Sequence, residues 1–396
     1  MEPLKPWRDD TRLTHSGRDP ANHAGTVNTP VYRSSTFIWP NSQTLPRYLE
    51  QAADPQLREH IYGRNGNPTT AAFEDAVAAL EGGFRSLVMP SGLAAIAGAI
   101  LALVQSGDHV LVTDNCYGHA RQLFDQVLPG MGVHVSYFVP LLGADLAALM
   151  RPNTRLVYAE APGSNTFEVQ DIPALARVAH AHGALLVMDN TWATPLFFKP
   201  FVHGVDVSLQ AATKYLVGHS DAMLGVITTT EALYSQVRER VRLLGYIAGA
   251  DDAYLGLRGL RTLGVRLRQH QQSGLAVARW LSARPQVLKV LHPALPGSPG
   301  HALFERDFLG ASGLFGVVLQ PVPDAALHAF LDSLQLFAQG ASWGGFESLI
   351  RIAHAQRTFP PALPRGHLLR LHVGLEAVDD LIADLDQGFT HLHSQP

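Results

Sequence analysis

The chain has 396 residues, of which 46% are hydrophobic and 16% charged, and a formal net charge of −4 at pH 7. This composition excludes a disordered chain, and the length suits one large domain and a smaller one. The slightly negative charge gives no electrostatic basis for binding nucleic acid or an anionic membrane. The single cysteine, Cys116, excludes an internal disulfide and is typical of a reducing compartment, so we expect a cytoplasmic protein.

Residues 1–60 are rich in Pro, Asn, Arg and Thr and show little helical periodicity. They contain no apolar core of the kind a signal peptide has, and the apolar run Leu93 to Val104 is too short to cross a membrane. We therefore expect an extended N-terminal arm of the kind with which an oligomer reaches a neighbouring subunit, and no membrane as a partner.

A possible anion site follows the glycine-rich loop that begins at Tyr62. Apolar spacing predicts a helix over residues 71–80 capped by Thr69. Residues 86–89 then form a predicted buried strand, and Pro90-Ser91-Gly92-Leu93 leads into an alanine-rich helix. Such a turn offers free amides and the positive end of a helix dipole to an anion, although a plain turn is the alternative. No Gly-Lys-Ser/Thr follows, which excludes a Walker loop.

Strand and helix patterns continue to alternate up to residue 189. The predicted strands cover residues 109–112, 133–138, 154–159 and 184–188, and the predicted helices cover residues 121–127, 144–150 and 172–182. Apolar strands separated by helices predict an α/β fold with a mostly parallel sheet covered on both faces. Ligands bind such sheets at the carboxyl ends of the strands, where Tyr117 and Asp189 stand.

The stretch from Asp206 to Gly225 begins as a strand and becomes small and polar around Lys214. Small neighbours leave room for a ligand, and burial disfavours the charged amine, so Lys214 is a candidate nucleophile or base rather than a surface lysine. Because Gly92, Tyr117 and Asp189 also follow strands, we expect them to meet Lys214 in one crevice. A lysine for a Schiff base and an aspartate for a pyridine nitrogen are what pyridoxal 5′-phosphate (PLP) requires.

The remaining residues predict a smaller α/β unit. A long helix over 254–284, strands at 287–291, 313–319 and 368–373, and helices at 324–334 and 378–387 complete the chain. We place the PLP-binding domain at residues 61–256 and the C-terminal domain at residues 257–396. His180 and His182 have the wrong spacing for two ligands on one helix face, and no HExxH motif occurs, so we expect no metal site.

Seven motifs spread over most of the chain resemble the Cys/Met-metabolism family of fold-type I PLP-dependent enzymes. They are YGRNGNPT from Tyr62, PSGLAAI from Pro90, MDNTWATPLFFKP from Met188, DVSLQAATKYLVGHSDAMLG from Asp206, RGLRTLGVRLRQH from Arg258, SWGGFESL from Ser342 and LLRLHVGLE from Leu368. The resemblance implies a domain with a large mixed, mostly parallel sheet and a smaller C-terminal α/β domain. It also implies a homotetramer made of two tight dimers.

The resemblance implies a role for each matching residue. Lys214 would bind PLP and move the substrate α-proton, Asp189 would pair with the pyridine nitrogen, and Tyr117 would stack on the ring. Gly92, Leu93 and Thr213 would hold the phosphate. Tyr62 and Arg64 would reach the phosphate from the neighbouring subunit, Arg370 would clamp the substrate carboxylate, and Ser342 with Trp343 would line the substrate side. For Arg370, a buried ion pair is the alternative.

The implied reaction is α,β-elimination of L-cystathionine to homocysteine, pyruvate and ammonia, a late step in methionine synthesis. Trp343 resembles the β-lyase branch of the family, and Ser164 stands where γ-lyases usually have asparagine. Ala211 replaces a serine that many members place beside the phosphate. The alternatives are a γ-lyase, a broad cysteine desulfhydrase or, less favoured, a regulatory or binding protein on the same fold. The absence of a Gly-x-Gly-x-x-Gly motif after a strand excludes a dinucleotide-dependent dehydrogenase.

Overall fold

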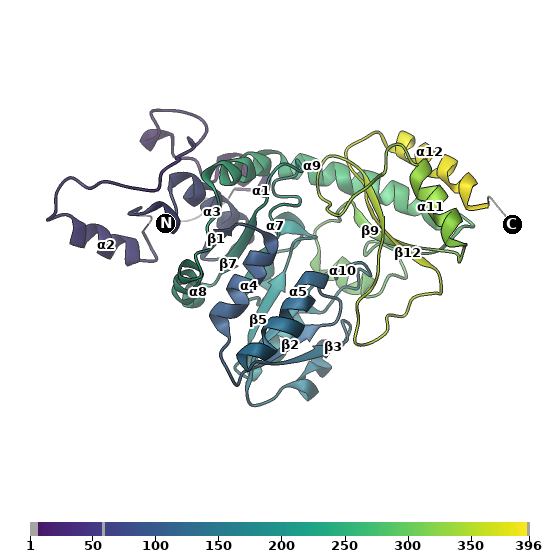
Figure 1. Cartoon of the computed structure of the whole chain (residues 1–396), viewed down its shortest axis with the longest axis horizontal. Coiled ribbons are helices and arrows are strands. Elements are labelled where there is room, and N and C mark those ends of the chain that lie inside the picture. Colours follow the sequence, from purple (N-terminus) through teal and green to yellow (C-terminus); the bar gives the residue numbers. More distant parts are fainter. Residues whose placement is uncertain (1–6, 58–59, 394–396) are drawn as a thin grey trace.

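In the computed structural model, which describes residues 7–57 and 60–393, the chain forms two sheets flanked by helices (Figure 1). The larger sheet has the strand order β1-β7-β6-β5-β4-β2-β3. Its strands are β1 Arg85–Met89, β2 His109–Thr113, β3 His134–Phe138, β4 Thr154–Glu160, β5 Leu185–Asp189, β6 Val207–Gln210 and β7 Gly225–Thr229. Strands β2 to β6 pair in parallel, whereas β7 runs antiparallel to both β1 and β6, so the predicted mixed, mostly parallel sheet is confirmed.

Helices cover both faces of this sheet because its strands are apolar on both sides. The α-helices of the chain are α1 Asp9–His15, α2 Leu45–Ala53, α3 Pro68–Glu81, α4 Gly92–Leu103, α5 Gly118–Gln122, α6 Ile172–Ala181, α7 Thr194–Phe197, α8 Glu231–Leu243, α9 Ala250–Ser282, α10 His301–Asp307, α11 Asp324–Ser333 and α12 Val378–Phe389. Helices α4 and α8 pack in the core on one face, and α6 packs in the core on the other. The sequence patterns missed β7 and α8, which follow Lys214 directly in the chain.

Short turns of helix connect several of these elements. They are η1 Pro20–Asn22, η2 Gly63–Asn65, the π-helical η3 Leu123–Val127, η4 Pro129–Met131, η5 Gly143–Leu149, η6 Pro200–His203 and η7 Thr390–His393. The predicted helix over 144–150 corresponds to η5, which is a 3₁₀-helix rather than an α-helix. The predicted helix over 121–127 is divided between α5 and η3.

Two predictions near the N-terminus need correction. Asn67, not Thr69, caps α3, because the Asn67 side chain accepts the amides of Thr69 and Thr70 while the Thr69 hydroxyl donates to Pro30 O. The region 1–60 is not extended throughout its described part. Helix α1 packs against α9 and buries Leu13, and α2 lies in the segment that projects from the body in Figure 1.

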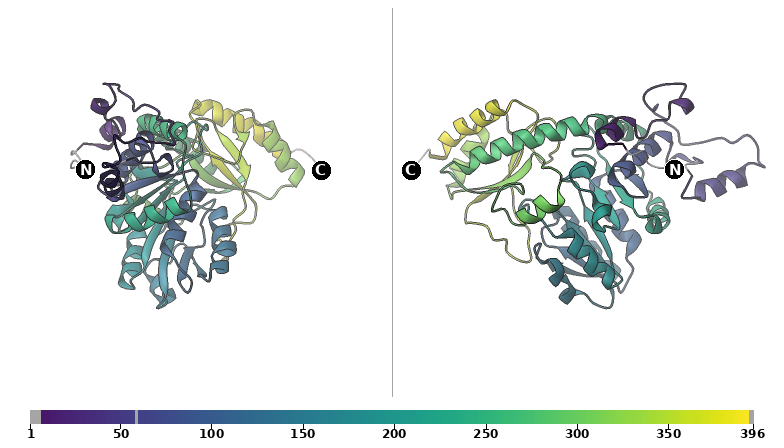
Figure 2. Two further views of the ribbon diagram at one scale, coloured as in Figure 1. Left: turned by 60° about the vertical axis from the view of Figure 1, so that its left-hand side comes forward. Right: turned by 180° about the vertical axis from the view of Figure 1, so that it is seen from behind.

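The smaller sheet has the order β10-β11-β12-β9-β8. Its strands are β8 Val287–Leu291, β9 Leu314–Leu319, β10 Ala338–Gln339, β11 Leu349–Ile352 and β12 His367–His372. Helix α9 runs from the large sheet to the small one (Figure 2), with Leu257 to Leu267 in one core and Val277 to Leu281 in another. The proposed domain boundary at residues 256–257 falls within this helix.

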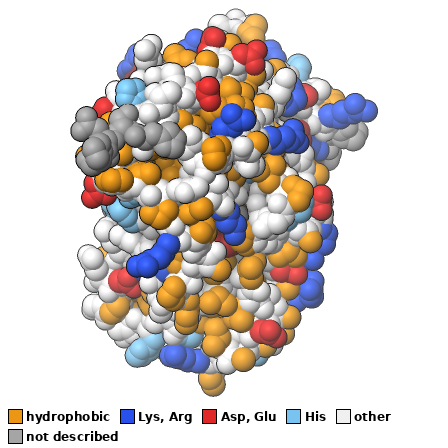
Figure 3. Space-filling model, turned by 90° about the vertical axis from the view of Figure 1, so that its right-hand side faces the viewer, with side chains coloured by type: hydrophobic (Ala, Val, Ile, Leu, Met, Phe, Trp, Pro, Cys, Tyr) orange, Lys and Arg blue, Asp and Glu red, His pale blue; other side chains and the backbone are white. Residues whose placement is uncertain are grey.

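The surface of the described chain has no sign of a membrane-spanning helix and carries mixed charges on the face shown in Figure 3. No helix in the described residues combines the length and apolar character needed to span a membrane. On the face shown in Figure 3, Lys and Arg side chains are interspersed with acidic and hydrophobic ones.

Candidate active site

The carboxyl ends of five strands meet at one edge of the large sheet. Strands β2, β4, β5 and β6 are parallel, and β1 has the same direction because both β1 and β6 pair antiparallel with β7. The residues that follow or end these strands therefore gather at that edge: Ser91, Tyr117, Glu160, Asp189 and Ala211. This is where ligands bind in open α/β sheets.

A continuous series of contacts joins the start of α4 to Asp189. A Cβ on Gly92 would lie 2.5 Å from the Ala211 Cβ, so only glycine fits against this neighbour. The Ala211 amide donates to Thr191 Oγ1 at 2.8 Å, and that hydroxyl donates to Asp189 Oδ1 at 2.6 Å. Thr191, to which the sequence reasoning gave no role, thus connects the glycine turn to the aspartate.

Asp189 is a buried carboxylate with one oxygen still available. The Thr191 amide and hydroxyl both donate to Oδ1, at 2.9 and 2.6 Å, and Oδ2 accepts no hydrogen bond from the described residues. Burial raises the pKa of Asp189, whereas the Thr191 hydrogen bonds and the Lys214 charge act in the opposite direction. The free oxygen can accept a proton donor such as a pyridinium N–H.

Glu160 lies beside Asp189, because the two residues are partners in the β4–β5 register. Burial, followed by the charge of Asp189, raises the pKa of Glu160 well above its ordinary value. Two adjacent buried carboxyl groups cannot both ionise without a large cost, and Asp189 has the Thr191 donors and Lys214 in its favour. We therefore assign the shared proton to Glu160 and the negative charge to Asp189.

The Lys214 amine lies between the two sheets. Its Nζ donates to Ser342 Oγ at 2.7 Å and lies 5.3 Å from the centroid of the Trp343 ring. Burial, with a further contribution from the Arg370 charge, lowers the pKa of Lys214 to about 8, against the opposing effect of Asp189. The amine therefore loses its proton far more readily than an ordinary lysine, and its minor neutral fraction near pH 7 can act as a nucleophile or base.

The first turn of α4 provides an anion site. Ser91 Oγ accepts the Ala94 amide at 3.0 Å, while the amides of Gly92 and Leu93 have no acceptor within the described chain. The Thr213 hydroxyl donates to Leu224 O at 3.0 Å and accepts the Leu224 amide at 2.9 Å. A phosphate contact through Thr213 would thus require its hydroxyl hydrogen to turn away from Leu224.

The residues of this edge fit PLP. Lys214 matches the aldehyde carbon, Asp189 Oδ2 matches the pyridine nitrogen, and the free amides of Gly92 and Leu93 match the phosphate. Asp189 Oδ2 and the two amides have no competing partner in the described chain, whereas the Lys214 amine is held only by its hydrogen bond to Ser342 Oγ.

One loop of the smaller sheet, around Gly344, and strand β12 form the opposite wall. Gly344 has a φ of 86°, and a Cβ there would lie 2.9 Å from the Lys214 carbonyl carbon, so the backbone of this segment rests on the lysine itself. Arg370 Nη2 donates to Ala341 O at 3.0 Å and to Ser342 O at 2.8 Å. No described carboxylate pairs with Arg370, which leaves Nε and Nη1 available to a ligand and disagrees with the buried ion-pair alternative.

The crevice of this site lies between the strand ends and the segment 342–344. Tyr117 is at its mouth, with 42% of its surface exposed. Its amide donates to Glu160 Oε2 at 2.7 Å, which fixes the backbone at the end of β2. Burial, Glu160 and Asp189 raise the pKa of the phenol, whereas the charges of Arg370 and Arg351 lower it. The exposed ring can therefore stack on a bound aromatic group close to Arg370.

Tyr62 and Arg64 lie apart from these residues. The Arg64 guanidinium donates to Arg242 O at 3.1 Å and lies 5.5 Å from the Tyr62 ring centroid, and 46% of the Tyr62 surface is exposed. In the described part of the chain, neither residue contacts Lys214, Asp189 or Gly92.

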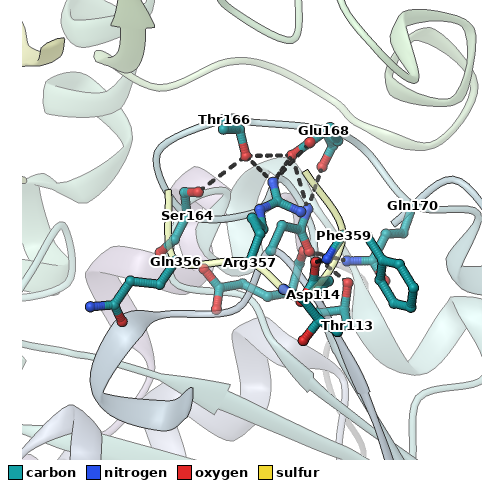
Figure 4. A network of polar contacts seen from close by, with 12 residues as sticks. Thr113, Asp114, Ser164, Thr166, Glu168, Gln170, Gln356, Arg357 and Phe359 are labelled. Carbon is teal, nitrogen blue, oxygen red and sulfur yellow. Dashed lines mark hydrogen bonds and ion pairs between the residues drawn. The ribbon is translucent and has the colours of Figure 1, made fainter. Parts of the chain in front are cut away.

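A polar network that the sequence did not reveal holds the segment 353–366 over the large domain (Figure 4). Arg357 forms an ion pair with Glu168 at 2.8 Å, and both side chains are largely buried. Asp114 accepts the amides of Thr358 and Phe359 at 2.8 Å each, and it also pairs with Arg121. These contacts join positions far apart in the chain, so they could not be predicted from local sequence patterns. They form only when the segment 353–366 packs on the large domain.

Comparisons with known proteins agree over nearly the whole chain. The family model of Cys/Met metabolism PLP-dependent enzymes matches residues 10–390. The chain is 44% identical over 392 residues to the cystathionine beta-lyase MetC of Escherichia coli (strain K12), covering 97% of this chain and 98% of that protein. The cystathionine beta-lyase of Salmonella typhimurium is also 44% identical, with the same coverage. A crystal structure of metB from Corynebacterium glutamicum superposes with a TM-score of 0.88 at 31% identity, covering 98% of this chain and 99% of the other.

Proposed function

The chain belongs to the family of Cys/Met metabolism PLP-dependent enzymes, and we propose that it is a carbon–sulfur β-lyase that cleaves L-cystathionine. The products of this α,β-elimination are homocysteine, pyruvate and ammonia. The 44% identity to two cystathionine beta-lyases over 97% of the chain supports this substrate. The cofactor is PLP, as the family requires and as the free groups at the strand edge allow.

The observation that carries the proposal is the position of the Lys214 amine. It lies within 2.7 Å of Ser342 Oγ and beside Trp343, and its pKa is lowered to about 8. This arrangement puts one base between the free groups that match PLP and the wall that would receive an amino-acid substrate. A regulatory protein on the same fold would not need a lysine kept partly neutral at this point.

Each residue of the crevice has a chemical task in such an elimination. When bound, PLP supplies an electron sink for the negative charge that develops at the substrate α-carbon. Lys214 takes the α-proton and returns a proton to the departing sulfur, and Ser342 Oγ holds the amine in place between the two transfers. Asp189 keeps its negative charge opposite a pyridine nitrogen, while Arg370 binds the α-carboxylate through its free guanidinium edge. Trp343 shields the amine from water.

Product analysis tests the reaction. Purified protein supplied with PLP and L-cystathionine should form pyruvate and homocysteine in equal amounts. Formation of 2-oxobutyrate and cysteine instead would replace the β-lyase with a γ-lyase. Turnover of cystine or cysteine at a higher kcat/KM than cystathionine would favour the broad desulfhydrase.

We also propose a cytoplasmic homotetramer, a dimer of dimers, in which Tyr62 and Arg64 complete the phosphate site of the neighbouring subunit. Their exposure and their distance from the crevice of their own chain support this arrangement. Mixing inactive Lys214→Ala and Arg64→Ala subunits should restore part of the activity, because each hybrid dimer contains one fully wild-type site. No recovery after verified subunit exchange would contradict a shared site. The division of the chain at residues 256–257 likewise stands as a proposal.

A further inference from the structure

One charged side chain at the mouth of the crevice has no place in the proposed reaction. Arg351, on β11, is exposed, and its only hydrogen bond within the described chain is from Nε to the neighbouring Ile352 O at 3.2 Å. No described carboxylate forms an ion pair with it.

The strand register places Arg351 directly opposite Arg370. The two residues are partners in the antiparallel pairing of β11 with β12, so their side chains leave the same face of the sheet, with Cβ atoms about 5 Å apart. Like charges directly opposite each other destabilise a sheet. A pair of arginines at this position therefore needs an anion to offset the repulsion.

The same row of residues continues toward the crevice. Arg370 pairs with Gly316 on β9, and a Cβ on Gly316 would lie 2.8 Å from the Asn165 carbonyl oxygen of the large domain. The opposite face of the sheet carries Ile350 and Leu371 into the hydrophobic core. Arg370 and Arg351 consequently face the large domain, where both of their charges act on the phenol of Tyr117.

Contacts between the segment after β11 and the large domain keep the surroundings of Arg351 open. The segment after β11 is fastened to the large domain by the pair Arg357–Glu168 and by the Asp114 carboxylate, which accepts two of its amides. Asn165 Nδ2 also donates to His354 O at 3.5 Å. Arg351, just before this fastened segment, is thus kept at the rim rather than folding over the crevice.

We propose that Arg351 determines substrate specificity by binding a second carboxylate, at the end of the substrate remote from the bond that is cleaved. This deepens the proposed function and rests on it: Arg370 takes the α-carboxylate, and the facing Arg351 takes the distal one. The preferred substrates are thioether amino acids with an anionic far end, and neutral S-alkylcysteines are disfavoured.

The test compares S-(3-carboxypropyl)-L-cysteine with S-butyl-L-cysteine, which has the same chain length without the carboxylate, and includes L-cystathionine. In Arg351→Gln holoenzyme, the ratio of kcat/KM for the carboxylated over the neutral substrate should fall about tenfold, mainly through KM for the carboxylated substrate, as expected for one lost charge-assisted hydrogen bond. Arg351→Lys should restore part of the ratio. Arg365→Gln, which removes an exposed arginine at the other end of the same loop, should leave the ratio as in wild type.

The outcomes separate the two proposals. An unchanged ratio in Arg351→Gln, or an equal loss on both substrates, overturns the role of Arg351. Wild-type protein that releases no pyruvate from L-cystathionine overturns the proposed β-lyase instead, whatever Arg351 does. Comparable circular dichroism and PLP absorbance of the variants would show that a fallen ratio does not come from misfolding.

Discussion

The two walls of the crevice are built in different ways. The wall from the large sheet uses buried groups at strand ends, such as Asp189 and Glu160, whose positions follow from the parallel register. The wall from the small sheet uses loop residues, such as Ser342, and the arginine row on β11 and β12. Binding PLP requires a fixed, dry environment, whereas choosing among substrates requires polar groups that solvent and ligand can reach. Five experiments test this contrast.

Removing the amine that lies between the walls should have the largest effect. Lys214→Ala is expected to lower turnover by about 10³-fold or more, because base and nucleophile are lost together. It should also abolish the visible absorbance of lysine-bound PLP. Lys289→Ala, on β8 of the small sheet, is the matched control and should behave as wild type. Turnover close to wild type in Lys214→Ala would contradict the mechanism.

The charge of Asp189 belongs to the first wall alone. Asp189→Asn removes the negative group that we propose for the pyridine nitrogen and should reduce kcat by about 10²-fold, a size typical of one lost electrostatic contact in a dry site. The absorbance of bound PLP should shift as well. A variant with altered KM and unchanged kcat and spectrum would place Asp189 on the substrate side.

Arg370→Gln addresses the second wall. Loss of a charge-assisted contact with the α-carboxylate should raise KM by about 10- to 100-fold. The absorbance of bound PLP should remain that of wild type, unlike in Asp189→Asn. An equal disturbance of the cofactor spectrum in both variants would remove the distinction between the walls.

The ion pair between Arg357 and Glu168, which attaches the segment 353–366 to the large domain, should contribute more to stability than to catalysis. Arg357→Gln leaves the buried Glu168 carboxylate without its partner, which should lower the free energy of unfolding by about 3 kcal/mol. Chemical denaturation of holoenzyme measures this loss. The double variant Arg357→Gln, Glu168→Gln should recover part of it, and additive losses in that cycle would show that the pair is not coupled.

Acid should lower the stability of the small-sheet wall, because two buried histidines lie behind it. Burial lowers the pKa of His372 to about 3 and that of His270 to about 4, and both rings pack against Tyr215. Because the folded-state pKa values lie below the unfolded value of about 6.5, the stability they provide is complete above that pH and is lost as the pH falls toward 4. At pH 5, each of the two buried histidines should lower the free energy of unfolding by roughly 1–2 kcal/mol relative to pH 7. In His372→Gln the fall in stability between pH 7 and pH 5 should be smaller, and an unchanged profile would contradict this assignment.

Much of the first wall could be predicted from the chain alone. Strand ends are visible as apolar runs that stop at Asp189 or Tyr117, and parallel strands must bring their carboxyl ends to one edge. The helix cap at Asn67 was missed because Thr69 has equally suitable chemistry, and only the position of Pro68 at the first helical residue decided between them. The strand β7 was missed although its Val-Ile-Thr-Thr run is rich in β-branched residues, which are typical of a strand.

Periodicity and short motifs encode strand ends and helix starts locally, so the sequence alone was enough to nominate the groups that we propose hold the cofactor. Which distant residues face these groups becomes clear only in the folded chain. Thr191 reaches both Asp189 and Ala211, Arg357 finds Glu168, and Arg351 stands opposite Arg370. A register depends on which strands pair, and a carboxylate buried beneath a loop depends on how the two sheets pack, so no local run of residues carries that information.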